Sequence, residues 1–424
     1  MIRIMKYGEV ANEDIFARSV PAVDVAGIVT DIISQVRARG DAALLDYCEK
    51  FDRVRLSSLE VTPEELDAAV ARMEPEFMDA LTTAATNIRC FHEKQVRQSF
   101  IIAEKDGVVM GQKITPLDRV GLYVPGGTAA YPSTVLMDAI PAKIAGCGEI
   151  VITTPPARDG SVNPAILAAA KVAGVDRIFK VGGAQAIAAL AYGTETVPCV
   201  DKIVGPGNAF VAEAKKQVFG RVAIDMIAGP SEILVVADGK SNARQVAADM
   251  LSQAEHDKMA SAVLVTDSMV LAEAVREEIE RQVRLLPRYE IASASIDING
   301  KIIVADSIDQ AIGISNAIAP EHLELCLDNP FDYLDKVRHA GSIFMGRYCP
   351  EALGDYLAGP NHTLPTGGTA RFYSPLSVDD FVKKSQYTYF TRDALGTVAD
   401  KIAVFARKEG LEGHARSVLS RFDN

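Results

Sequence analysis

The chain has 424 residues, of which 48% are hydrophobic and 24% are charged, and its formal net charge is −12. This length exceeds one typical domain core, so two or more domains are expected, and the composition indicates a globular protein. The negative charge argues against nucleic acid as a main partner, because phosphate neutralisation needs a basic face. No apolar run of about 18 residues occurs, so no membrane span is expected.

The six cysteines are scattered along the chain and lack the CxxC spacing of a zinc cassette. They suggest no disulfide framework either, and this usage fits a reducing compartment. The first nine residues also lack the continuous apolar core of a signal peptide. We therefore expect a cytoplasmic protein.

Residues 1–100 are expected to be mostly helical. Residues 23–39 are amphipathic and end at Gly40, and Thr62-Pro63 has the N-cap and first-turn proline of another helix. Residues 75–96 suggest a longer helix. None of these segments carries obvious chemistry, so a scaffold role is predicted for them.

From residue 120 the pattern changes to short apolar strands that alternate with helices. The first block has expected strands at 120–124, 150–154, 177–181 and 202–204. A second block begins at Gly229 and has expected strands at 233–237, 262–266, 302–305 and 342–345. This alternation predicts βαβ units and parallel sheets. The last fifty residues are expected to return to helix.

Glycine turns at 126–127, 182–183 and 205–207 each follow a strand and open a helix. A dinucleotide's pyrophosphate binds at such turns, because free N–H groups point outward there. None of the turns is a complete GxGxxG motif, and Phe210 stands where a third glycine would be. Tight βα turns use glycine in any case, so each turn alone is a weak signal.

Glu321 and His322 form a side-by-side carboxylate and imidazole directly after Pro320. Pro320 fits the first position of a helix, which would place the pair in the first turn and favour an ionised Glu321. The pair would supply a base beside a carboxylate that activates water. Taken alone, such neighbours are usually ordinary surface residues.

Other polar residues gather in three places. Gln253 and His256 are three apart at the end of an expected helix, so they share one face. Asp355 and His362 lie in a loop rich in glycine and proline, and the tail adds Glu409 and His414. Gln253, His256, Asp355 and His414 together make a plausible nitrogen and oxygen site for zinc or a similar ion. By contrast, His92 and His339 lie in ordinary helical patterns, and we expect them to be structural.

Cys147 follows Gly146 in a helix-to-strand turn. Its thiol could act as the nucleophile of an aldehyde oxidation. The alternative, a small buried apolar residue, is the more ordinary role for such a cysteine.

With these segments in view, the sequence resembles the histidinol dehydrogenase family over nearly its full length. The motifs that carry the resemblance are GLYVPGG at 121–127, VGGAQA at 181–186, GPGN at 205–208, IDM at 224–226, AGPSE at 228–232, QAEH at 253–256, PEH at 320–322 and GDY at 354–356. The resemblance implies oxidation of L-histidinol to L-histidine through an aldehyde, with two NAD⁺ used in turn. It also implies a homodimer whose C-terminal tail is exchanged between subunits.

The resemblance also implies a role for individual residues. Glu321 and His322 would be catalytic. Zinc would be held by Gln253, His256, Asp355 and His414, and NAD would contact Tyr123, Gln185 and Asn208. The substrate would contact Ser231, His322, His362 and Glu409, besides the metal ligands.

The predicted fold is of the α/β class, with two incomplete Rossmann-like parallel-sheet domains, a helical N-terminal segment and a helical C-terminal tail. The expected boundaries are 1–17 for the N-terminal segment, 18–124 with 231–373 for a larger domain that carries the metal and catalytic residues, 125–230 for the NAD-binding domain and 374–424 for the tail. Two alternatives stay open. One is a related zinc and NAD dehydrogenase of another primary alcohol, and the other is a binding protein without turnover.

Overall fold

The computed structural model describes residues 2–18, 24–126 and 130–423. The chain forms two compact units, and each is described by itself. The first unit comprises Met1–Gln95 with Leu117–Phe381, and the second comprises Val96–Pro116 with Val382–Asn424. Among the described residues, no helix is long and apolar enough to span a membrane.

The first unit contains a five-stranded parallel sheet in the order β6-β5-β4-β7-β8. Its strands are β4 (Arg119–Tyr123), β5 (Glu149–Thr154), β6 (Arg177–Lys180), β7 (Lys202–Val204) and β8 (Ala223–Ile224). The connecting helices are α6 (Pro132–Ala145), α7 (Pro164–Ala173), α8 (Gly183–Tyr192) and α9 (Ala209–Val218). Numbered along the chain, this order is 3-2-1-4-5, which is the Rossmann order without its sixth strand.

A six-stranded parallel sheet in the same unit has the order β1-β11-β10-β9-β12-β13. Its strands are β1 (Arg3–Lys6), β9 (Glu232–Ala237), β10 (Ser261–Thr266), β11 (Lys301–Val304), β12 (His322–Cys326) and β13 (Ser342–Met345). Its helices are α10 (Ala243–Ala254), α11 (Met269–Gln282), α12 (Tyr289–Asn299), α13 (Ile308–Ile318), α14 (Phe331–Leu334) and α15 (Glu351–Tyr356). From β9 to β13 the order is again 3-2-1-4-5, and β1 extends one edge. The predicted α/β class with two incomplete Rossmann-like sheets is thus confirmed.

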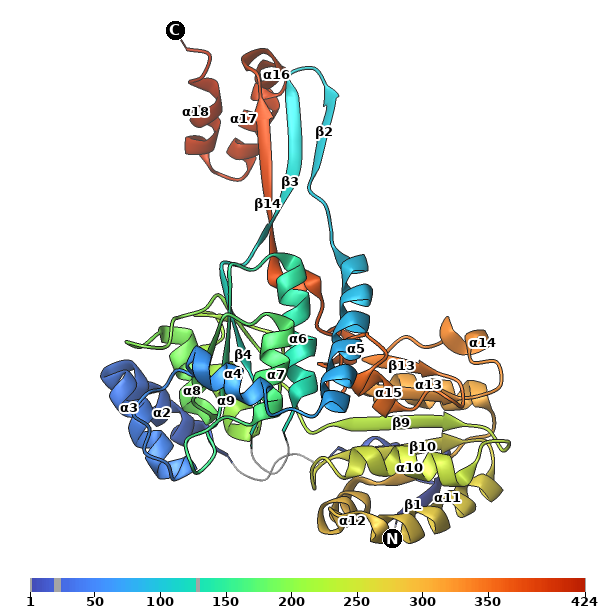
Figure 1. Cartoon of the computed structure of the whole chain (residues 1–424). Coiled ribbons are helices and arrows are strands. Elements are labelled where there is room, and N and C mark those ends of the chain that lie inside the picture. Colours follow the sequence, from blue (N-terminus) through green and yellow to red (C-terminus); the bar gives the residue numbers. More distant parts are fainter. Residues whose placement is uncertain (1, 19–23, 127–129, 424) are drawn as a thin grey trace. The chain divides into compact units, whose positions relative to one another are not determined.

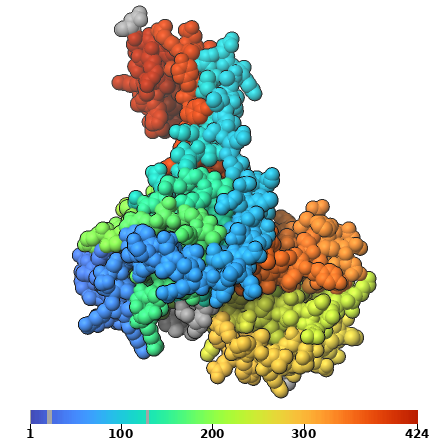
Figure 2. Space-filling model, viewed as in Figure 1, coloured from blue at the N-terminus to red at the C-terminus, as the bar shows by residue number. Residues whose placement is uncertain are grey.

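Both faces of each sheet are covered by helices, as the apolar strands require. In β9, Ile233 and Val235 pack with α10–α12, whereas Leu234 and Val236 pack with α13 on the opposite face. The N-terminal helices belong to the five-stranded sheet, where α2 packs on α8 and α9, and α5 packs on α6. Figure 2 shows this blue layer at the surface beside the green segment.

The remaining elements of the first unit are short or belong to this N-terminal layer. They are α1 (Asn12–Phe16), α2 (Ala26–Arg39), α3 (Asp41–Tyr47), η1 (Cys48–Asp52), α4 (Pro63–Val70), α5 (Pro75–His92), η2 (Glu93–Gln95), η3 (Val283–Leu285), η4 (Thr369–Arg371) and η5 (Val378–Phe381). The predicted start of α4 has a full capping box, because Thr62 and Glu65 each bond the other's backbone N–H.

The second unit is an antiparallel sheet with three helices (Figure 1). Its strands β2 (Phe100–Lys105), β3 (Val108–Pro116) and β14 (Val382–Phe390) lie in the order β14-β3-β2. The helices are α16 (Arg392–Gly396), α17 (Ala399–Lys408) and α18 (Glu412–Leu419), of which α17 and α18 pack on each other.

Three expectations about local structure were wrong. Residues 3–6 of the N-terminal segment form β1, because they pair with β11 at the edge of the six-stranded sheet. The tail is not wholly helical, since residues 382–390 pair along the whole of β3. Pro320 does not begin a helix, because Ala319 adopts a left-handed backbone (φ 52°) that ends α13, and the chain then enters β12.

β4 also bears on the expected domain boundaries. Residues 18–124 were expected to share a domain with residues 231–373. In the structure β4, at Arg119–Tyr123, is the middle strand of the five-stranded sheet and pairs with β5 and β7.

Candidate active site

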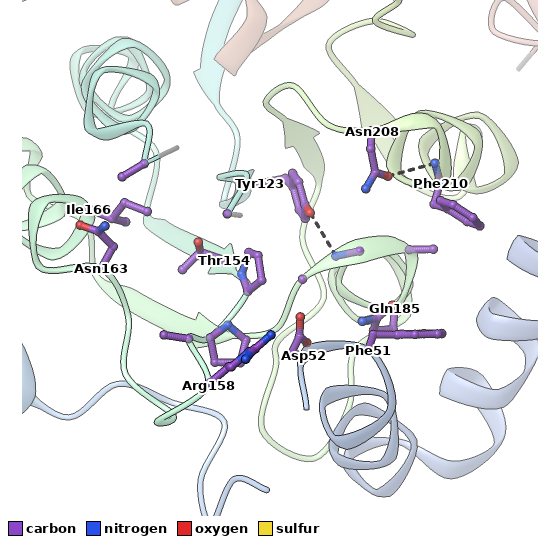
Figure 3. A pocket seen from close by; sticks show the side chains of 18 of the residues that line it. Phe51, Asp52, Tyr123, Thr154, Arg158, Asn163, Ile166, Gln185, Asn208 and Phe210 are labelled. Atoms are coloured by element: carbon purple, nitrogen blue, oxygen red, sulfur yellow. Dashed lines mark hydrogen bonds between the residues drawn. The ribbon is translucent and has the colours of Figure 1, made fainter. Parts of the chain in front are cut away.

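A cavity of about 1060 Å³ opens at the carboxyl ends of the strands of the five-stranded sheet (Figure 3). Ligands of open α/β sheets bind at this edge, at the point where the strand order reverses. Tyr123, Gln185 and Asn208, the three predicted dinucleotide contacts, all line this cavity. The structure therefore brings these three residues together around one space.

The turn between β6 and α8 is fixed by the buried Tyr123. The Gly183 N–H donates a hydrogen bond to the Tyr123 hydroxyl over 3.0 Å, and burial raises the pKa of Tyr123 to about 12. Gly183 has a left-handed backbone (φ +66°), which favours glycine at this position. The phenol thus stays neutral and shapes the wall of the cavity.

The turn between β7 and α9 is held on both sides of Gly205. The Gly205 N–H donates to Asp225 Oδ2 over 2.8 Å, and its carbonyl accepts from Lys215 Nζ over 3.0 Å. Lys215 and Asp225 also form an ion pair in which both side chains are 2% exposed. Asn208 then caps α9, since its Oδ1 accepts from the N–H groups of Phe210 and Val211. This cap uses only the oxygen of Asn208 and leaves its amide nitrogen free to donate.

A second polar cluster lies at the amino edge of the six-stranded sheet. His322, Glu324 and Cys326 alternate along β12 and therefore share the face opposite to Leu323 and Leu325. That face packs against α10 and α15, which carry further polar side chains of the cluster. The polar cluster of this sheet thus lies at the amino ends of its strands.

His322 is oriented by a backbone carbonyl. Its Nδ1 lies 3.0 Å from the Glu232 carbonyl oxygen, so Nδ1 carries the proton and Nε2 keeps its lone pair. Nε2 lies 4.0 Å from Asp355 Oδ1 and has no hydrogen-bond partner among the described residues. Burial lowers the pKa of His322 to about 4, against the raising effect of Asp355. The imidazole is therefore neutral near pH 7, with one nitrogen ready to accept a proton.

Glu321 lies beside this imidazole. Its Oε2 accepts the Glu232 N–H over 2.8 Å and lies 3.7 Å from His322 Nδ1. Burial raises the pKa of Glu321 well above its ordinary value, and this effect outweighs the hydrogen bond from Glu232. The expected helix start at Glu321 was wrong, because Glu321 precedes the buried strand β12, and burial works against the ionisation that a helix start would favour. A carboxylate with a raised pKa is a stronger base toward water.

Asp355 and His362 face His322 across a small cavity of about 110 Å³. His362 Nδ1 lies 3.7 Å from Asp355 Oδ1, and its Nε2 lies 3.4 Å from the Thr134 hydroxyl on α6. Burial lowers the pKa of His362. The loop that carries His362 is pinned by Asn361, which donates to the Met137 carbonyl over 2.6 Å. The structure thus brings Asp355, His322 and His362 together.

Gln253 and His256 lie at the end of α10. Gln253 is 1% exposed, and its Oε1 has no hydrogen-bond partner among the described residues. His256 Nδ1 lies 2.9 Å from the Ser252 carbonyl, which leaves Nε2 as the free nitrogen. A histidine that binds zinc usually donates its other ring N–H to such a carbonyl. The unpartnered amide oxygen and the oriented imidazole therefore fit the predicted metal-ligand roles.

Glu351 belongs to the cluster and was missed from the sequence. Its Oε2 accepts from the Ser252 hydroxyl over 3.1 Å, and its Oε1 lies 3.8 Å from His322 Nδ1. His322, Glu351 and Asp355 offer ligand atoms that all lie within 4.8 Å of one another. Glu351 precedes Asp355 by four residues on α15, so helical spacing was the available signal.

A carboxyl pair beneath this cluster was also missed. Asp249 and Glu324 interact, and burial raises the pKa of Asp249 to about 6 and that of Glu324 well above its ordinary range. Glu324 Oε1 accepts the Glu351 N–H over 2.7 Å. The alternation of β12 places Glu324 on the face of His322, which is the pattern that could have indicated it.

The other predicted site residues lie elsewhere in the chain. Ser231 is half-buried just before β9, and its carbonyl accepts the Ser261 N–H over 3.0 Å. Glu409 ends α17 and His414 lies in the first turn of α18, and both are exposed. These two residues belong to the second unit, whereas the cluster just described belongs to the first.

Cys147 is a core residue. It is 7% exposed, packs within the apolar cluster of α6 and β5, and its thiol donates to the Phe381 carbonyl over 3.7 Å. Burial raises the pKa of Cys147 to about 11. The thiolate needed for nucleophilic attack is therefore disfavoured, in agreement with the buried alternative.

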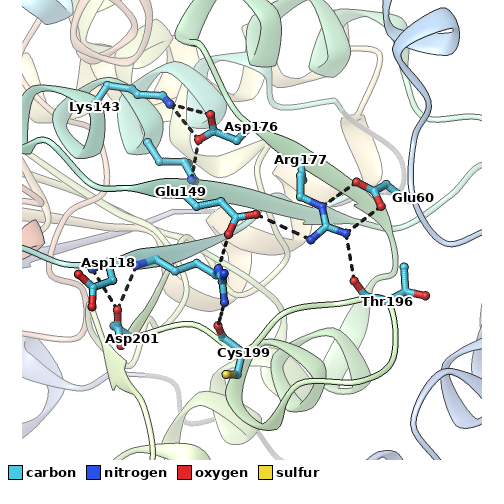
Figure 4. A network of polar contacts seen from close by, with 11 residues as sticks. Glu60, Asp118, Lys143, Glu149, Asp176, Arg177, Thr196, Cys199 and Asp201 are labelled. Carbon is cyan, nitrogen blue, oxygen red and sulfur yellow. Dashed lines mark hydrogen bonds and ion pairs between the residues drawn. The ribbon is translucent and has the colours of Figure 1, made fainter.

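The opposite edge of each sheet is closed by charged side chains. At the amino edge of the five-stranded sheet, Arg177 binds Glu60 through two hydrogen bonds of 2.7 and 2.8 Å (Figure 4). Arg119 pairs with Glu149, which also lies 3.8 Å from Arg177. At the carboxyl edge of the six-stranded sheet, Arg347 donates to both oxygens of one carboxylate and to a backbone carbonyl. Its partners there are Asp238 Oδ1 at 2.8 Å, Asp238 Oδ2 at 3.0 Å and the Cys326 carbonyl at 2.7 Å.

Known proteins resemble this chain over its full length. A family model described as histidinol dehydrogenase matches residues 17–422. The histidinol dehydrogenase of Clostridium acetobutylicum is 56% identical over 427 residues, covering 100% of this chain and 99% of that protein. The histidinol dehydrogenase of Lactiplantibacillus plantarum is 57% identical over 399 residues, covering 94% of this chain and 93% of that protein. The chain belongs to the histidinol dehydrogenase family.

A solved structure extends the agreement to the fold. The crystal structure of histidinol dehydrogenase from Elizabethkingia anophelis has a TM-score of 0.94 and 40% sequence identity, and covers 99% of this chain and 98% of that one. The family predicted from the sequence motifs is thereby confirmed, as is the class of oxidoreductase.

Proposed function

We propose that this member of the histidinol dehydrogenase family oxidises L-histidinol through L-histidinal to L-histidine, with two NAD⁺ used in turn and one zinc ion in the site. The observation that carries the proposal is the neutral His322, whose Nε2 has no hydrogen-bond partner among the described residues. Glu321, with its raised pKa, stands beside it. A proton acceptor beside a water-activating carboxylate is what an alcohol-to-acid oxidation needs.

In the first oxidation, His322 Nε2 accepts the proton of the substrate hydroxyl. Burial keeps the imidazole neutral, and the Glu232 carbonyl keeps its other nitrogen protonated. Asp355, 4.0 Å from Nε2, stabilises the imidazolium that forms. NAD⁺, when bound, supplies the hydride acceptor for each oxidation.

The second oxidation requires water, because an aldehyde offers no suitable hydride until a water molecule adds to it. Glu321 accepts a proton from that water as it attacks the aldehyde carbon, and the imidazolium of His322 returns the proton of the first oxidation to the carbonyl oxygen, which gives the neutral hydrate and restores neutral His322. His322 then accepts the hydroxyl proton of the hydrate as it did that of the alcohol. Glu321 and His322 are only 6% and 4% exposed, so the buried cluster excludes bulk water. The protons are therefore transferred between groups of the site and not to the solvent.

The zinc ligands in this proposal are Gln253, His256, Asp355 and His414. The unpartnered Oε1 of Gln253 and the free Nε2 of His256 support the assignment. Zinc, when bound, supplies a positive charge that holds the imidazole and amine nitrogens of the substrate and so orients its carbinol. We assign Ser231, His362 and Glu409 to substrate binding, together with His322 and the metal ligands.

We further propose a homodimer in which each C-terminal tail serves the partner's site. The second unit exposes large apolar side chains, which are Ile101, Tyr389, Val404 and Phe405 at 68%, 59%, 60% and 74% exposure. Burial of these side chains at a subunit contact would be favourable. A two-fold dimer that exchanges an element builds two identical shared sites.

A cytoplasmic location completes the proposal. All six cysteines are free thiols. Unpaired cysteines fit a reducing compartment.

NADH absorbance tests the proposal directly. Zinc-loaded protein mixed with NAD⁺ and L-histidinol should produce two NADH for each histidine formed, and a chelator should stop the reaction until zinc is restored. A panel of other primary alcohols distinguishes a related dehydrogenase, which would turn over another alcohol faster. A binding protein without turnover would produce no NADH with any of them.

A further inference from the structure

The dinucleotide cavity lacks one feature that Rossmann-like sites usually have. In such sites an acidic residue at the end of the second strand binds the ribose hydroxyls of the adenosine half. Here the second strand is β5, and the chain continues from Thr154 as Pro155-Pro156-Ala157-Arg158. The carboxyl end of β5 therefore contributes no carboxylate to the cavity.

Asp52 brings a carboxylate to the same cavity from another element. It is the last residue of η1, a π-helical turn, and it lines the cavity together with Phe51 (Figure 3). π-Helical turns often occur at functional sites. Arg53 follows with a left-handed backbone (φ 59°), which is uncommon for a residue other than glycine. The backbone thus adopts unusual conformations where it delivers Asp52 to the cavity wall.

The carboxylate of Asp52 has unused hydrogen-bonding capacity. Its Oδ2 is covered and has no hydrogen-bond partner among the described residues. The terminal torsion of an aspartate is broad, so the group can turn toward a ligand. Burial raises the pKa of Asp52 to about 6, and the group is therefore ionised at neutral and higher pH.

Two neighbours of Asp52 complete a surface for the adenosine half. Phe51 lines the cavity and is 48% exposed, with Tyr47 stacked on its ring at a centroid distance of 5.4 Å and Lys50 Nζ 5.2 Å from the ring centroid. The exposed part of the ring offers an apolar contact for a base. Arg158 lines the same cavity and makes no ion pair among the described residues. Its guanidinium suits a phosphate group.

We propose that Asp52 accepts hydrogen bonds from the adenosine ribose hydroxyls of the dinucleotide and thereby excludes the 2′-phosphorylated form. The proposal rests on the dinucleotide role of the cavity given under Proposed function. A carboxylate accepts hydrogen bonds from the two hydroxyls of a ribose, and its negative charge repels a phosphate at the 2′ position. Without that repulsion, Arg158 would favour the phosphorylated form.

The test measures binding of ADP-ribose and of 2′-phospho-ADP-ribose by calorimetry to the zinc-loaded protein. Asp52→Asn should weaken ADP-ribose binding by about 10-fold or more, the usual range for a hydrogen bond to a charged group. Its preference for ADP-ribose over the phosphorylated probe should fall by at least about 10-fold. Glu49→Gln is the matched control, because Glu49 lies in the same π-helical turn, pairs with Arg55 at 2.7 Å and does not line the cavity.

A measurement on the unmodified protein gives an independent test, whatever the variant does to folding. ADP-ribose that lacks the adenosine 2′-hydroxyl should bind about 10-fold or more weakly than ADP-ribose. The proposal is overturned if the unmodified protein binds ADP-ribose and its 2′-deoxy form equally. It is also overturned if Asp52→Asn keeps both the affinity for ADP-ribose and the preference for ADP-ribose over 2′-phospho-ADP-ribose. In that case, normal NADH production from histidinol would show that the proposed function stands. Absence of both ADP-ribose binding and NADH production would overturn both proposals together.

Discussion

His322 and Glu232 are joined by a 3.0 Å contact between the imidazole Nδ1 and a backbone carbonyl oxygen. The N–H of the same residue, Glu232, donates to Glu321 Oε2 over 2.8 Å. One residue at the start of β9 therefore orients both members of the pair through backbone atoms alone. A side-chain substitution at Glu232 would leave these two contacts in place.

Glu321→Gln separates the two oxidations. The amide cannot accept a proton from water, so oxidation of supplied histidinal should slow by about 100-fold or more. Oxidation of histidinol to the aldehyde level needs no water and should slow far less. Single-turnover NADH formation with each substrate measures both rates, and equal losses would refute the assigned role.

His322→Asn should slow both oxidations, because the same nitrogen accepts a proton in each. A loss of about 10²- to 10⁴-fold is expected for removal of a general base. Binding of ADP-ribose should be unchanged, since its cavity lies at the other sheet. Loss of that binding would indicate a damaged fold and not a lost base.

Cys147→Ala should leave kcat and KM nearly unchanged. The thiol packs in the core, and its pKa of about 11 disfavours the thiolate. A stability loss of about 1 kcal/mol is expected from the smaller side chain. If activity fell by several orders of magnitude with the fold intact, a covalent thiohemiacetal would have to replace the hydrate.

Asp138→Asn should stabilise the protein at high pH and not at low pH. Burial raises the pKa of Asp138 to about 7, although the Thr363 hydroxyl donates to it over 2.8 Å. The folded state therefore keeps a proton that the unfolded state loses between about pH 4 and 7, and wild-type stability falls as the pH rises through that window. At pH 8 the variant should gain on the order of 4 kcal/mol, and at pH 4 almost nothing. Urea unfolding at both pH values measures the difference.

Mixing two inactive proteins tests the exchanged tail. One carries His256→Ala and the other carries His414→Ala. In a mixed dimer with crossing tails, one site has both lesions and the other has none, so activity should approach half of normal per mixed dimer. If each tail serves its own chain, every site keeps one lesion and mixing restores nothing.

Much of the fold could be predicted from periodicity. The expected strands at 233–237, 262–266 and 342–345 correspond closely to β9, β10 and β13, because short apolar runs between helices leave little ambiguity. The antiparallel strands were not predicted. Every residue of β2 is exposed, so the segment has no alternation between a buried and an open face.

The site was harder to predict, since its geometry depends on long-range packing. Pro320 suggested a helix, but His322 to Cys326 form a strand that is buried on both faces. Pairing of β12 with β9 and β13 outweighs the local preference of Pro320 for a helix start. Burial raises the pKa of Glu321 and so opposes its expected ionisation, and this desolvation depends on neighbours that sequence spacing does not reveal. Glu351 was missed because residues 354–366 were expected to form a loop, whereas Glu351 and Asp355 lie four residues apart on α15.

The two sheets share one strand order, but their sites lie at opposite edges. The cavity of the five-stranded sheet lies at the carboxyl ends of its strands, and the polar cluster of the six-stranded sheet lies at the amino ends. Arg347 binds Asp238 and the Cys326 carbonyl at the carboxyl ends of β9 and β12, the position in the six-stranded sheet that corresponds to the proposed dinucleotide cavity of the other sheet. The proposed function places one NAD⁺ at a time in that cavity. An oxidation that removes four electrons must then change cofactors halfway. In the proposed reaction the half-oxidised aldehyde is held at the six-stranded sheet while NADH leaves the five-stranded sheet and a second NAD⁺ enters. Separate binding sites for substrate and cofactor would let the cofactor exchange without release of the reactive aldehyde.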